Sequence, residues 1–196
     1  MSSQELVDIV DENNEVIKTV TRAKMRKEQL PHRASYIALC NSKGNFLVEV
    51  RTLNKDYAPG LFDAVVGGVI QHGEDFDESA KRELLEEVGI DADLKEVEFH
   101  SLGNCKIVGK SKMRYFYGYL YLAKTDLITK RQASEVSGIM YLPFEDIIKL
   151  KDSTTHDSVV ALLEIIKRAK EKKLLEMFFC AFAERQLKAQ YKIINN

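Results

Sequence analysis

Apolar and polar residues alternate over some stretches of the chain and recur every three or four residues over others. The first pattern, together with short apolar runs between turn residues, predicts strands over residues 5–20 (two strands around a turn at 11–14), 34–41, 45–51, 61–70, 97–103, 113–123 and 139–144. The second pattern, together with capping residues, predicts helices over residues 22–30, 77–88, 145–151 and 156–173. Strands and helices share one chain, which indicates a mixed α and β fold.

The two ends of the chain are predicted to be additions to a central domain. At the N-terminus, Thr21 suits the N-cap of a short helix that Pro31 ends, and the alternation before it favours an added hairpin over a loosely attached arm. At the other end, residues 153–196 contain neither glycine nor proline, which favours a long helical segment. We therefore predict three parts, at residues 1–31, 32–152 and 153–196.

The C-terminal segment carries more aromatic residues than a solvated helix needs. These are Phe178, Phe179, Phe182 and Tyr191. They either pack back on the domain or form a contact with a partner, and that partner could be a second copy of the chain.

The stretch from residue 67 to residue 90 concentrates acidic residues on one predicted helix. Glu83, Glu86 and Glu87 stand at positions i, i+3 and i+4, so they lie within about 100° of one another around the helix. A solvated acidic face is the ordinary meaning of such a pattern. Three carboxylates on one face repel each other, however, and a divalent cation with oxygen ligands, Mg²⁺ above all, would neutralise them.

The same helix carries an apolar stripe that faces away from its glutamates. Ala80, Leu84 and Val88 are spaced by four and can pack against a sheet, and Leu85 widens the stripe. The glutamates are then expected to point into a cleft.

Composition describes an ordinary globular protein. The chain has 196 residues, of which 45% are hydrophobic and 30% charged, and its net charge is −1. This balance predicts no affinity for nucleic acid, and the apolar runs are too short to span a membrane. No signal peptide is evident, and Cys40, Cys105 and Cys180 are odd in number and widely spaced, so we expect free thiols in a reducing, cytoplasmic compartment.

The order of the acidic stretch resembles the signature of the Nudix hydrolases. Gly68 is followed after five residues by Glu74, and after seven more by Arg82-Glu83-Leu84-Leu85-Glu86-Glu87-Val88-Gly89-Ile90. The match holds at every defined position of the Nudix box. The resemblance implies an α/β (α+β) fold, an α/β/α sandwich with a mixed sheet, here with the N-terminal hairpin and a long C-terminal helical tail.

A second resemblance, over roughly residues 5–168, is to the Nudix branch that is similar to isopentenyl-diphosphate isomerase. Those isomerases carry Cys-Gly-His where this chain has Val66-Gly67-Gly68, and Cys40 and Cys105 lie elsewhere in the sequence. His32 matches a metal-binding histidine of the isomerases, but without its partners it is expected to be structural. The box therefore favours a hydrolase over an isomerase.

The resemblance implies a division of roles within the box. Glu86 and Glu87, with the carbonyl of Gly67, are expected to bind Mg²⁺, for which Mn²⁺ is an alternative, and Glu83 is expected to bind a second ion or to accept the proton of the attacking water. Arg82 is expected to orient a glutamate through a bidentate contact, and Glu74 to act as an orienting partner rather than as a ligand. Gly68 and Gly89 are structural residues of the box, and Gly89 suits the left-handed end of the helix.

Further candidates lie outside the box. Glu135 could supply an additional acid from a late loop, and Arg51, Lys55 and, more weakly, Arg33 could bind substrate phosphates. Each is equally well explained as an exposed charge. The tyrosines at 115, 117, 119 and 121 could stack a nucleobase, although packing between strands is the simpler interpretation.

These observations predict a Mg²⁺-dependent hydrolase that cleaves a diphosphate bond in a nucleoside di- or triphosphate or in a related conjugate. Isomerisation of an isoprenyl diphosphate is one alternative. A catalytically idle domain that binds a nucleotide or a protein is another, but such domains lose box glutamates and this chain has retained all of them.

Overall fold

The computed structural model describes residues 3–109 and 115–175. The strands within these ranges are β1 (Leu6–Val10), β2 (Val16–Thr21), β3 (Arg33–Cys40), β4 (Phe46–Arg51), β5 (Phe62–Asp63), β6 (Glu98–Val108), β7 (Tyr115–Lys124) and β8 (Val136–Leu142). The helices are α1 (Arg22–Glu28), α2 (Phe76–Val88), α3 (Phe144–Lys149), the 3-10 helix η1 (Lys151–Ser153) and α4 (His156–Glu171). The predicted elements are present in the described ranges with ends that shift by a few residues, except that the strand predicted over residues 61–70 is reduced to Phe62–Asp63.

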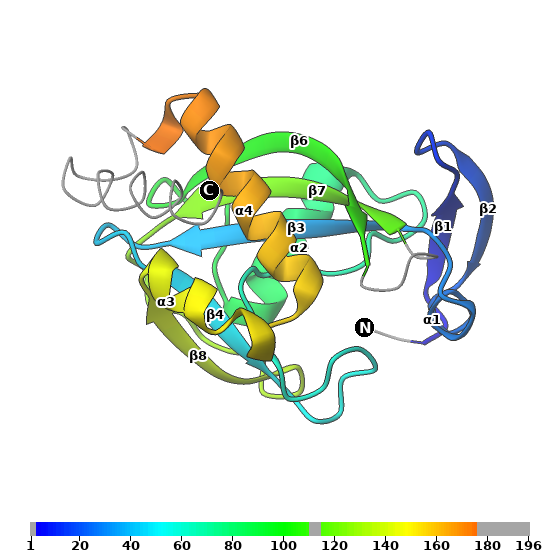
Figure 1. The fold of residues 1–196 in the computed structure, drawn as a ribbon, viewed down its shortest axis with the longest axis horizontal. Helices are drawn as coiled ribbons and strands as arrows, with labels where there is room; N and C mark the ends of the chain where they lie inside the picture. Colours follow the sequence, from blue (N-terminus) through cyan, green and yellow to red (C-terminus); the bar gives the residue numbers. More distant parts are fainter. Residues whose placement is uncertain (1–2, 110–114, 176–196) are drawn as a thin grey trace.

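Five strands of a six-stranded mixed sheet follow one another in the order β5-β4-β3-β7-β6, and the sixth, β8, pairs with β4 over Phe46–Arg51. β3 and β7 run parallel, whereas β4, β6 and β8 pair antiparallel with their neighbours. α2 covers one face of this sheet, and α4 crosses the opposite face (Figure 1). The predicted α/β/α sandwich with a mixed sheet is therefore confirmed.

Two apolar clusters fill the spaces between these layers. Alternate residues of β3 point into opposite clusters, so Ile37 packs with Leu84 of α2 while Ala38 packs with Ile165 of α4. The tyrosines of β7 follow the same rule, and we find Tyr119 and Tyr121 buried under α2 while Leu120 is buried under α4. Both faces of β7 are buried over residues 117–123, because a helix covers each of them.

Strands β1 and β2 form a separate two-stranded sheet, which confirms the predicted N-terminal hairpin. Thr21 is the N-cap of α1 and accepts a hydrogen bond from the backbone N–H of Lys24. Met25 of α1 is buried together with Val7 and Ile9 of β1 and with Val69 of the central domain. This shared apolar cluster fastens the hairpin and α1 to the domain. Figure 1 shows both elements at one side of the central sheet.

The segment before α2 differs from the single strand predicted over residues 61–70. Only Phe62–Asp63 pairs with β4, and residues 66 and 69 form isolated bridges to β3. The interruption lies at Gly67, whose φ is +154°, and a Cβ atom there would lie 2.0 Å from the carbonyl oxygen of Ser35. The strand is broken because the backbone of Gly67 approaches β3 too closely for any side chain.

α2 is held at both ends by local interactions. Asp75 caps its N-terminus by accepting hydrogen bonds from the N–H groups of Asp77 and Glu78, and Gly89 ends it in the left-handed conformation. Ala80, Leu84 and Val88 are fully buried, as predicted. Leu85 is 53% exposed, so it does not widen the apolar stripe; its direction around the helix carries it beyond the sheet.

The last predictions concern the two ends of the chain. The structure describes helix only as far as residue 175, and the aromatic stretch around Phe178 and Tyr191, like Cys180, lies outside the described residues. The division into three parts and the dimer through the C-terminal segment stay predictions. None of the helices in the described ranges has both the length and the apolar character that crossing a membrane requires.

Candidate active site

The three glutamates of α2 differ in burial. Glu83 and Glu87, one helical turn apart, are 1% and 3% exposed, whereas the side chain of Glu86 is 45% exposed. α2 therefore turns two carboxylates toward the interior and leaves the third at the rim.

Arg82 connects this acidic set. Its guanidinium forms a bidentate contact with Glu74, with Nε 2.6 Å from Oε1 and Nη2 3.1 Å from Oε2. Its Nη1 donates to Glu83 at 2.9 Å and to Glu86 at 3.1 Å. Glu74 in turn accepts a hydrogen bond from the N–H of Gln71. The bidentate contact expected of Arg82 is thus present, and one cation fixes the positions of three carboxylates.

A second cation, Lys55, contacts the carboxylates at the other end of the buried set. Its Nζ lies 2.9 Å from Oε1 of Glu87 and also forms an ion pair with Glu135. The second oxygen of Glu87 lies 3.4 Å from the N–H of Gly67. The structure therefore brings together Gly67, Glu87, Lys55 and Glu135, which come from four different segments of the chain.

Backbone hydrogen bonds explain how the late loop reaches this place. The N–H groups of Lys130 and Gln132 donate to the carbonyl oxygens of Val88 and Glu87, at the C-terminal end of α2. The carbonyl oxygen of Glu135 accepts from the N–H of Thr52, which begins the loop that carries Lys55. Glu135 is thus held beside α2, which is a position that its place in the sequence does not reveal.

Glu49 is a buried acidic residue that the sequence interpretation missed. It is 3% exposed, and its Oε1 is a buried atom without a hydrogen-bond partner among the described residues. It lies on the same face of β4 as Leu47, which packs under α2. The sequence did contain a signal for this residue: a glutamate stands at an inward-facing position of a strand that is otherwise apolar.

The pKa values of these acids follow from their surroundings. Burial, and next the charge of Glu87, raises the pKa of Glu83 to about 8. Burial and the same neighbour raise the pKa of Glu49 well above its ordinary value. Partial burial acts in the same direction on Glu135, but the hydrogen bond and charge of Lys55 lower the pKa of Glu135 to about 2.

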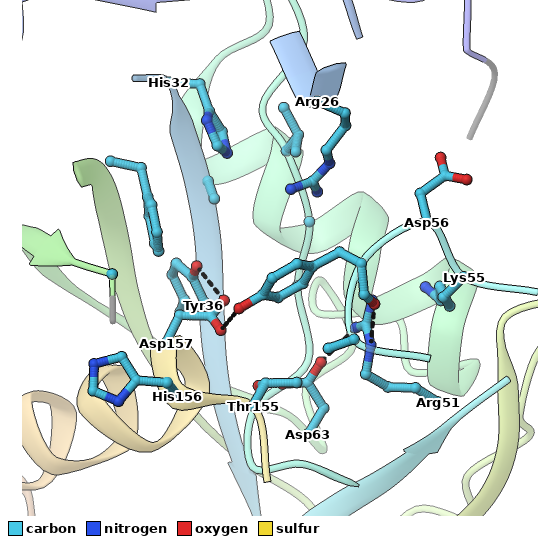
Figure 2. A pocket seen from close by; sticks show the side chains of 18 of the residues that line it. Arg26, His32, Tyr36, Arg51, Lys55, Asp56, Asp63, Thr155, His156 and Asp157 are labelled. Carbon is cyan, nitrogen blue, oxygen red and sulfur yellow. Dashed lines mark hydrogen bonds and ion pairs between the residues drawn. The ribbon is translucent and has the colours of Figure 1, made fainter. Parts of the chain in front are cut away.

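A cavity of about 640 Å³ opens beside the acidic set. Glu87, Gly67, Lys55 and Glu135 line one part of it. The loop over residues 52–61, helix α1, strand β3 and the first residues of α4 line the rest, as Figure 2 shows. Its volume suits a ligand of nucleotide size, and its walls come from every part of the fold.

Aromatic side chains line the part of the cavity away from the glutamates. The hydroxyl groups of Tyr36 and Tyr57 both donate to the carboxylate of Asp157, at 3.0 and 2.8 Å. Phe116 stacks on His32, with ring centroids 5.5 Å apart, and on Tyr36. Burial, and next the charge of Arg26, lowers the pKa of His32 to about 4, so this histidine is neutral at pH 7.

The remaining basic candidates have different positions. Arg51 lines the cavity, where its Nη1 lies 2.6 Å from Asp63 and its guanidinium donates to the carbonyl oxygen of Tyr57. Arg33 points elsewhere: it donates to Asn14 in the hairpin turn and lies over the ring of Phe76. It lines a smaller cavity together with Glu74.

The donor set fits a hard divalent cation, which is bound by oxygen ligands. Within the described ranges, no three acidic, histidine or cysteine side chains converge closely enough to hold a metal ion as they stand. Instead the ammonium group of Lys55 lies between Glu87 and Glu135, and one carboxylate oxygen of Glu49 has no hydrogen-bond partner within the described part of the chain. A divalent cation would complete this arrangement of several buried acids around a single ammonium group.

A mixed sheet between helices, with the box sequence on a glutamate-rich helix at the edge of a cavity, is the arrangement that the resemblance to Nudix hydrolases predicts. A family model described as the NUDIX domain matches residues 30–163. The Nudix hydrolase YfcD of Shigella flexneri is 38% identical over 183 residues, which span 90% of this chain and 94% of that protein. The chain belongs to the Nudix hydrolase family and is a Nudix pyrophosphohydrolase.

Other relatives and solved structures agree with this assignment. The Nudix hydrolase PA4841 of Pseudomonas aeruginosa is 44% identical over 96 residues, which span 48% of this chain and 57% of that protein. The structure of DR0079 from Deinococcus radiodurans has a TM-score of 0.66 at 22% identity and covers 80% of this chain and 97% of that one. The Nudix domain of NrtR from Shewanella oneidensis, crystallised with ADP-ribose, has a TM-score of 0.56 at 17% identity, covering 78% and 99%. These two structures share the fold.

Proposed function

We propose that this protein is a Mg²⁺-dependent enzyme that hydrolyses a diphosphate bond in a nucleoside di- or triphosphate or in a related nucleoside-diphosphate conjugate. The observation that supports this most directly is the pair of buried carboxylates, Glu83 and Glu87, on one face of α2. Glu87 reaches the same cavity as Gly67 and two basic residues, Lys55 and Arg51. An anionic substrate and the acids that would activate water can therefore meet in one place.

Glu86 and Glu87, with the carbonyl of Gly67, would hold the Mg²⁺ ion. When bound, the ion supplies neutralisation of the diphosphate charge and a lower pKa for a bound water. Glu83 is buried beside Glu87 and would bind a further ion or accept the proton of the attacking water. Glu135 is an additional acid that contacts the same lysine as Glu87.

The basic residues would act on the substrate and on the acids. Arg82, contacting Glu74, Glu83 and Glu86 together, keeps their carboxylates in fixed orientations. Lys55 and Arg51, which both line the cavity, would bind phosphate oxygens at its wall.

Isomerisation of an isoprenyl diphosphate receives no support from the cavity. The positions where isomerases carry cysteine and histidine are Val66 and Gly68 in this chain. Neither Cys40 nor Cys105 lines the cavity, and Cys40 is completely buried in the apolar cluster under α4. The described residues therefore offer no thiol to exchange a proton with a double bond.

The test is to measure release of phosphate, pyrophosphate or nucleoside monophosphate with Mg²⁺ and, in parallel, with a chelator. The compounds are nucleoside di- and triphosphates, ADP-ribose, NADH, coenzyme A and isopentenyl diphosphate, and the double variant Glu86→Gln, Glu87→Gln is run beside the wild type. Glu78→Gln, an exposed change on the same helix, is the matched control.

We expect release that requires Mg²⁺, that persists in the control, and that falls at least a hundredfold in the double variant. Equal release by the wild type and the double variant would overturn the proposal. Conversion of isopentenyl diphosphate without hydrolysis of any compound would replace it by the isomerase alternative.

A further inference from the structure

One cationic side chain at the cavity wall forms no ion pair with the described residues. Arg26, on α1, points from the N-terminal unit into the cavity, between His32 and the Tyr36–Asp157 pair (Figure 2). Its Nε is a buried atom without a hydrogen-bond partner among the described residues, and none of their carboxylates forms an ion pair with it. The Cζ atom of its guanidinium lies over the ring of Tyr57, 5.5 Å from the ring centroid.

Four of the six acids that line the cavity have other partners, and the remaining two, Asp56 and Asp152, are exposed. Asp157 accepts hydrogen bonds from two tyrosine hydroxyls, and Asp63 accepts from Arg51 and from Thr155. Glu87 and Glu135 share Lys55. Burial, and next the charge of Arg22, lowers the pKa of Arg26, although the nearby charge of Asp157 acts in the opposite direction. Because its Nε is buried without a hydrogen-bond partner among the described residues, the guanidinium is costly unless a ligand completes it.

The position of Arg26 is built into the fold. The preceding residue, Met25, is buried in the cluster that joins α1 to Val69 of the central domain. α1 ends three residues later at Gln29, which has the left-handed conformation and donates its N–H to the carbonyl oxygens of Arg26 and Met25. Anchoring on both sides keeps the guanidinium at the cavity wall, although α1 lies outside the Nudix box.

Neighbouring groups complete a polar subsite with aromatic walls. Nδ1 of His32 lies 2.9 Å from the carbonyl oxygen of Leu30, so in the neutral ring Nδ1 carries the proton and Nε2 remains an acceptor. Phe116 stacks on His32, and Tyr57 lies beside Arg26. The subsite thus offers a fixed cation, a neutral acceptor and planar apolar surface, in the same cavity as Glu87 and Lys55.

We infer that Arg26 is a specificity residue that binds a second oxyanion of the substrate, a phosphate or a carboxylate, at the end remote from the diphosphate that is cleaved. The inference rests on the proposed function, because it takes Glu87 and Lys55 to mark the end where the diphosphate lies. The preferred substrate class is then a nucleoside-diphosphate conjugate that carries one further anionic group. Arg26 supplies the planar fork that such a group binds in bidentate fashion.

Three pairs of compounds that differ by one such group provide the test. They are coenzyme A and its 3′-dephospho form, NADPH and NADH, and UDP-glucuronic acid and UDP-glucose. For each pair we would measure the ratio of kcat/KM values with Mg²⁺ for the wild type, Arg26→Gln and Arg26→Lys. Lys27→Gln removes the same charge from an exposed neighbour on α1 and is the matched control.

The expected result is a wild-type ratio of about ten to one hundred in favour of the more anionic member of at least one pair. That ratio falls toward one in Arg26→Gln, is partly retained in Arg26→Lys and is unchanged in Lys27→Gln. Absence of a preference in all three pairs, or an equal preference in Arg26→Gln, would overturn the inference.

A binding measurement separates this inference from the proposed function. Dissociation constants of the same pairs are measured by calorimetry in the presence of a chelator, so that no hydrolysis is needed. If no compound is hydrolysed, the proposed function fails; a tenfold or greater binding preference that Arg26→Gln abolishes would still support the Arg26 subsite. If hydrolysis proceeds but the ratio of dissociation constants does not depend on Arg26, the inference about Arg26 is rejected and the proposed function is kept.

Discussion

At the scale of single residues, the site depends on a close approach of backbone at Gly67. Its N–H lies beside Glu87, and its φ of +154° together with the 2.0 Å separation between a hypothetical Cβ and the Ser35 carbonyl oxygen leaves no room for a side chain. The resemblance to Nudix enzymes marked this residue as a metal ligand through its carbonyl. The structure adds a steric reason for glycine at the same position.

Gly67→Ala is therefore expected to lower the free energy of unfolding by about 3 kcal/mol or more, because β3 and the segment before α2 would have to separate. Gly73→Ala is the matched control: its φ is +75°, but no atom lies within 4 Å of the added Cβ. The control should cost about 1 kcal/mol in urea denaturation. Equal losses in the two variants would show that the approach to β3 does not matter.

The raised pKa of Glu83 predicts how the free energy of unfolding depends on pH. Burial and Glu87 raise its pKa to about 8 from the model-peptide value of 4.5, so the folded protein favours the protonated carboxyl. The contribution of this protonated carboxyl to the free energy of unfolding is fully present below about pH 4.5 and is lost as the pH rises through 8.

Between pH 6.5 and 8, in a chelator, the free energy of unfolding of the wild type should fall with a slope of up to about 1.4 kcal/mol per pH unit from this group. Glu83→Gln cannot ionise, and its slope in the same window should be smaller. Parallel slopes for the two proteins in urea titrations would contradict the assigned direction of the shift.

At the scale of elements, α2 carries both the packing face and the site. Its buried residues Ala80, Leu84 and Val88 place it against the sheet, and Asp75 and Gly89 define where it starts and stops. The position at which α2 begins sets the direction of Arg82, Glu83 and Glu87 around the helix. The site therefore requires that α2 begin at the correct residue.

Asp75→Ala removes the acceptor of two backbone N–H groups and is expected to destabilise the protein by about 1 kcal/mol. Asp75→Ser, which can still cap a helix, should recover most of this loss. Thermal or urea denaturation measures both, and a serine variant as unstable as the alanine variant would argue against a capping role.

At the scale of the whole molecule, the cavity joins segments that are far apart in the chain. α1, the loop over residues 52–61, α2, the loop before β8 and the start of α4 all line it. Binding of a metal ion and a substrate should therefore stabilise the entire fold rather than one element.

A Mg²⁺ concentration one hundred times the dissociation constant should stabilise the folded protein by about 2.7 kcal/mol, which corresponds to a Tm increase of about 5–11 °C for a chain of this size. Glu87→Gln should lose most of this increase, whereas the exposed Glu78→Gln should retain it. The measurement is differential scanning calorimetry with and without a chelator. A Tm that Mg²⁺ raises equally in Glu87→Gln would remove that residue from the proposed ligands.

The amino-acid sequence alone was sufficient for the family, the acidic helix and the elements other than the strand expected over residues 61–70. The reason is that apolar periodicity, caps such as Thr21 and the spacing from Gly68 to Ile90 are local properties, and local geometry places Glu83 and Glu87 on one face. The same local rules could not tell that Glu86 would lie at the rim or that Leu85 would be exposed. Those outcomes depend on where the sheet ends beneath the helix.

The tertiary structure alone decided which distant residues share the cavity. Lys55 and Glu135 meet Glu87 because the late loop is bonded to the end of α2. Glu49 is buried where the charge of Glu87 acts on it, because its strand turns that face toward the helix. Arg26 reaches the cavity because the buried side chain of Met25 docks α1 on the domain. Charge and residue type are visible in a sequence, but proximity across a sheet is set by packing between elements, and a single sequence does not contain it.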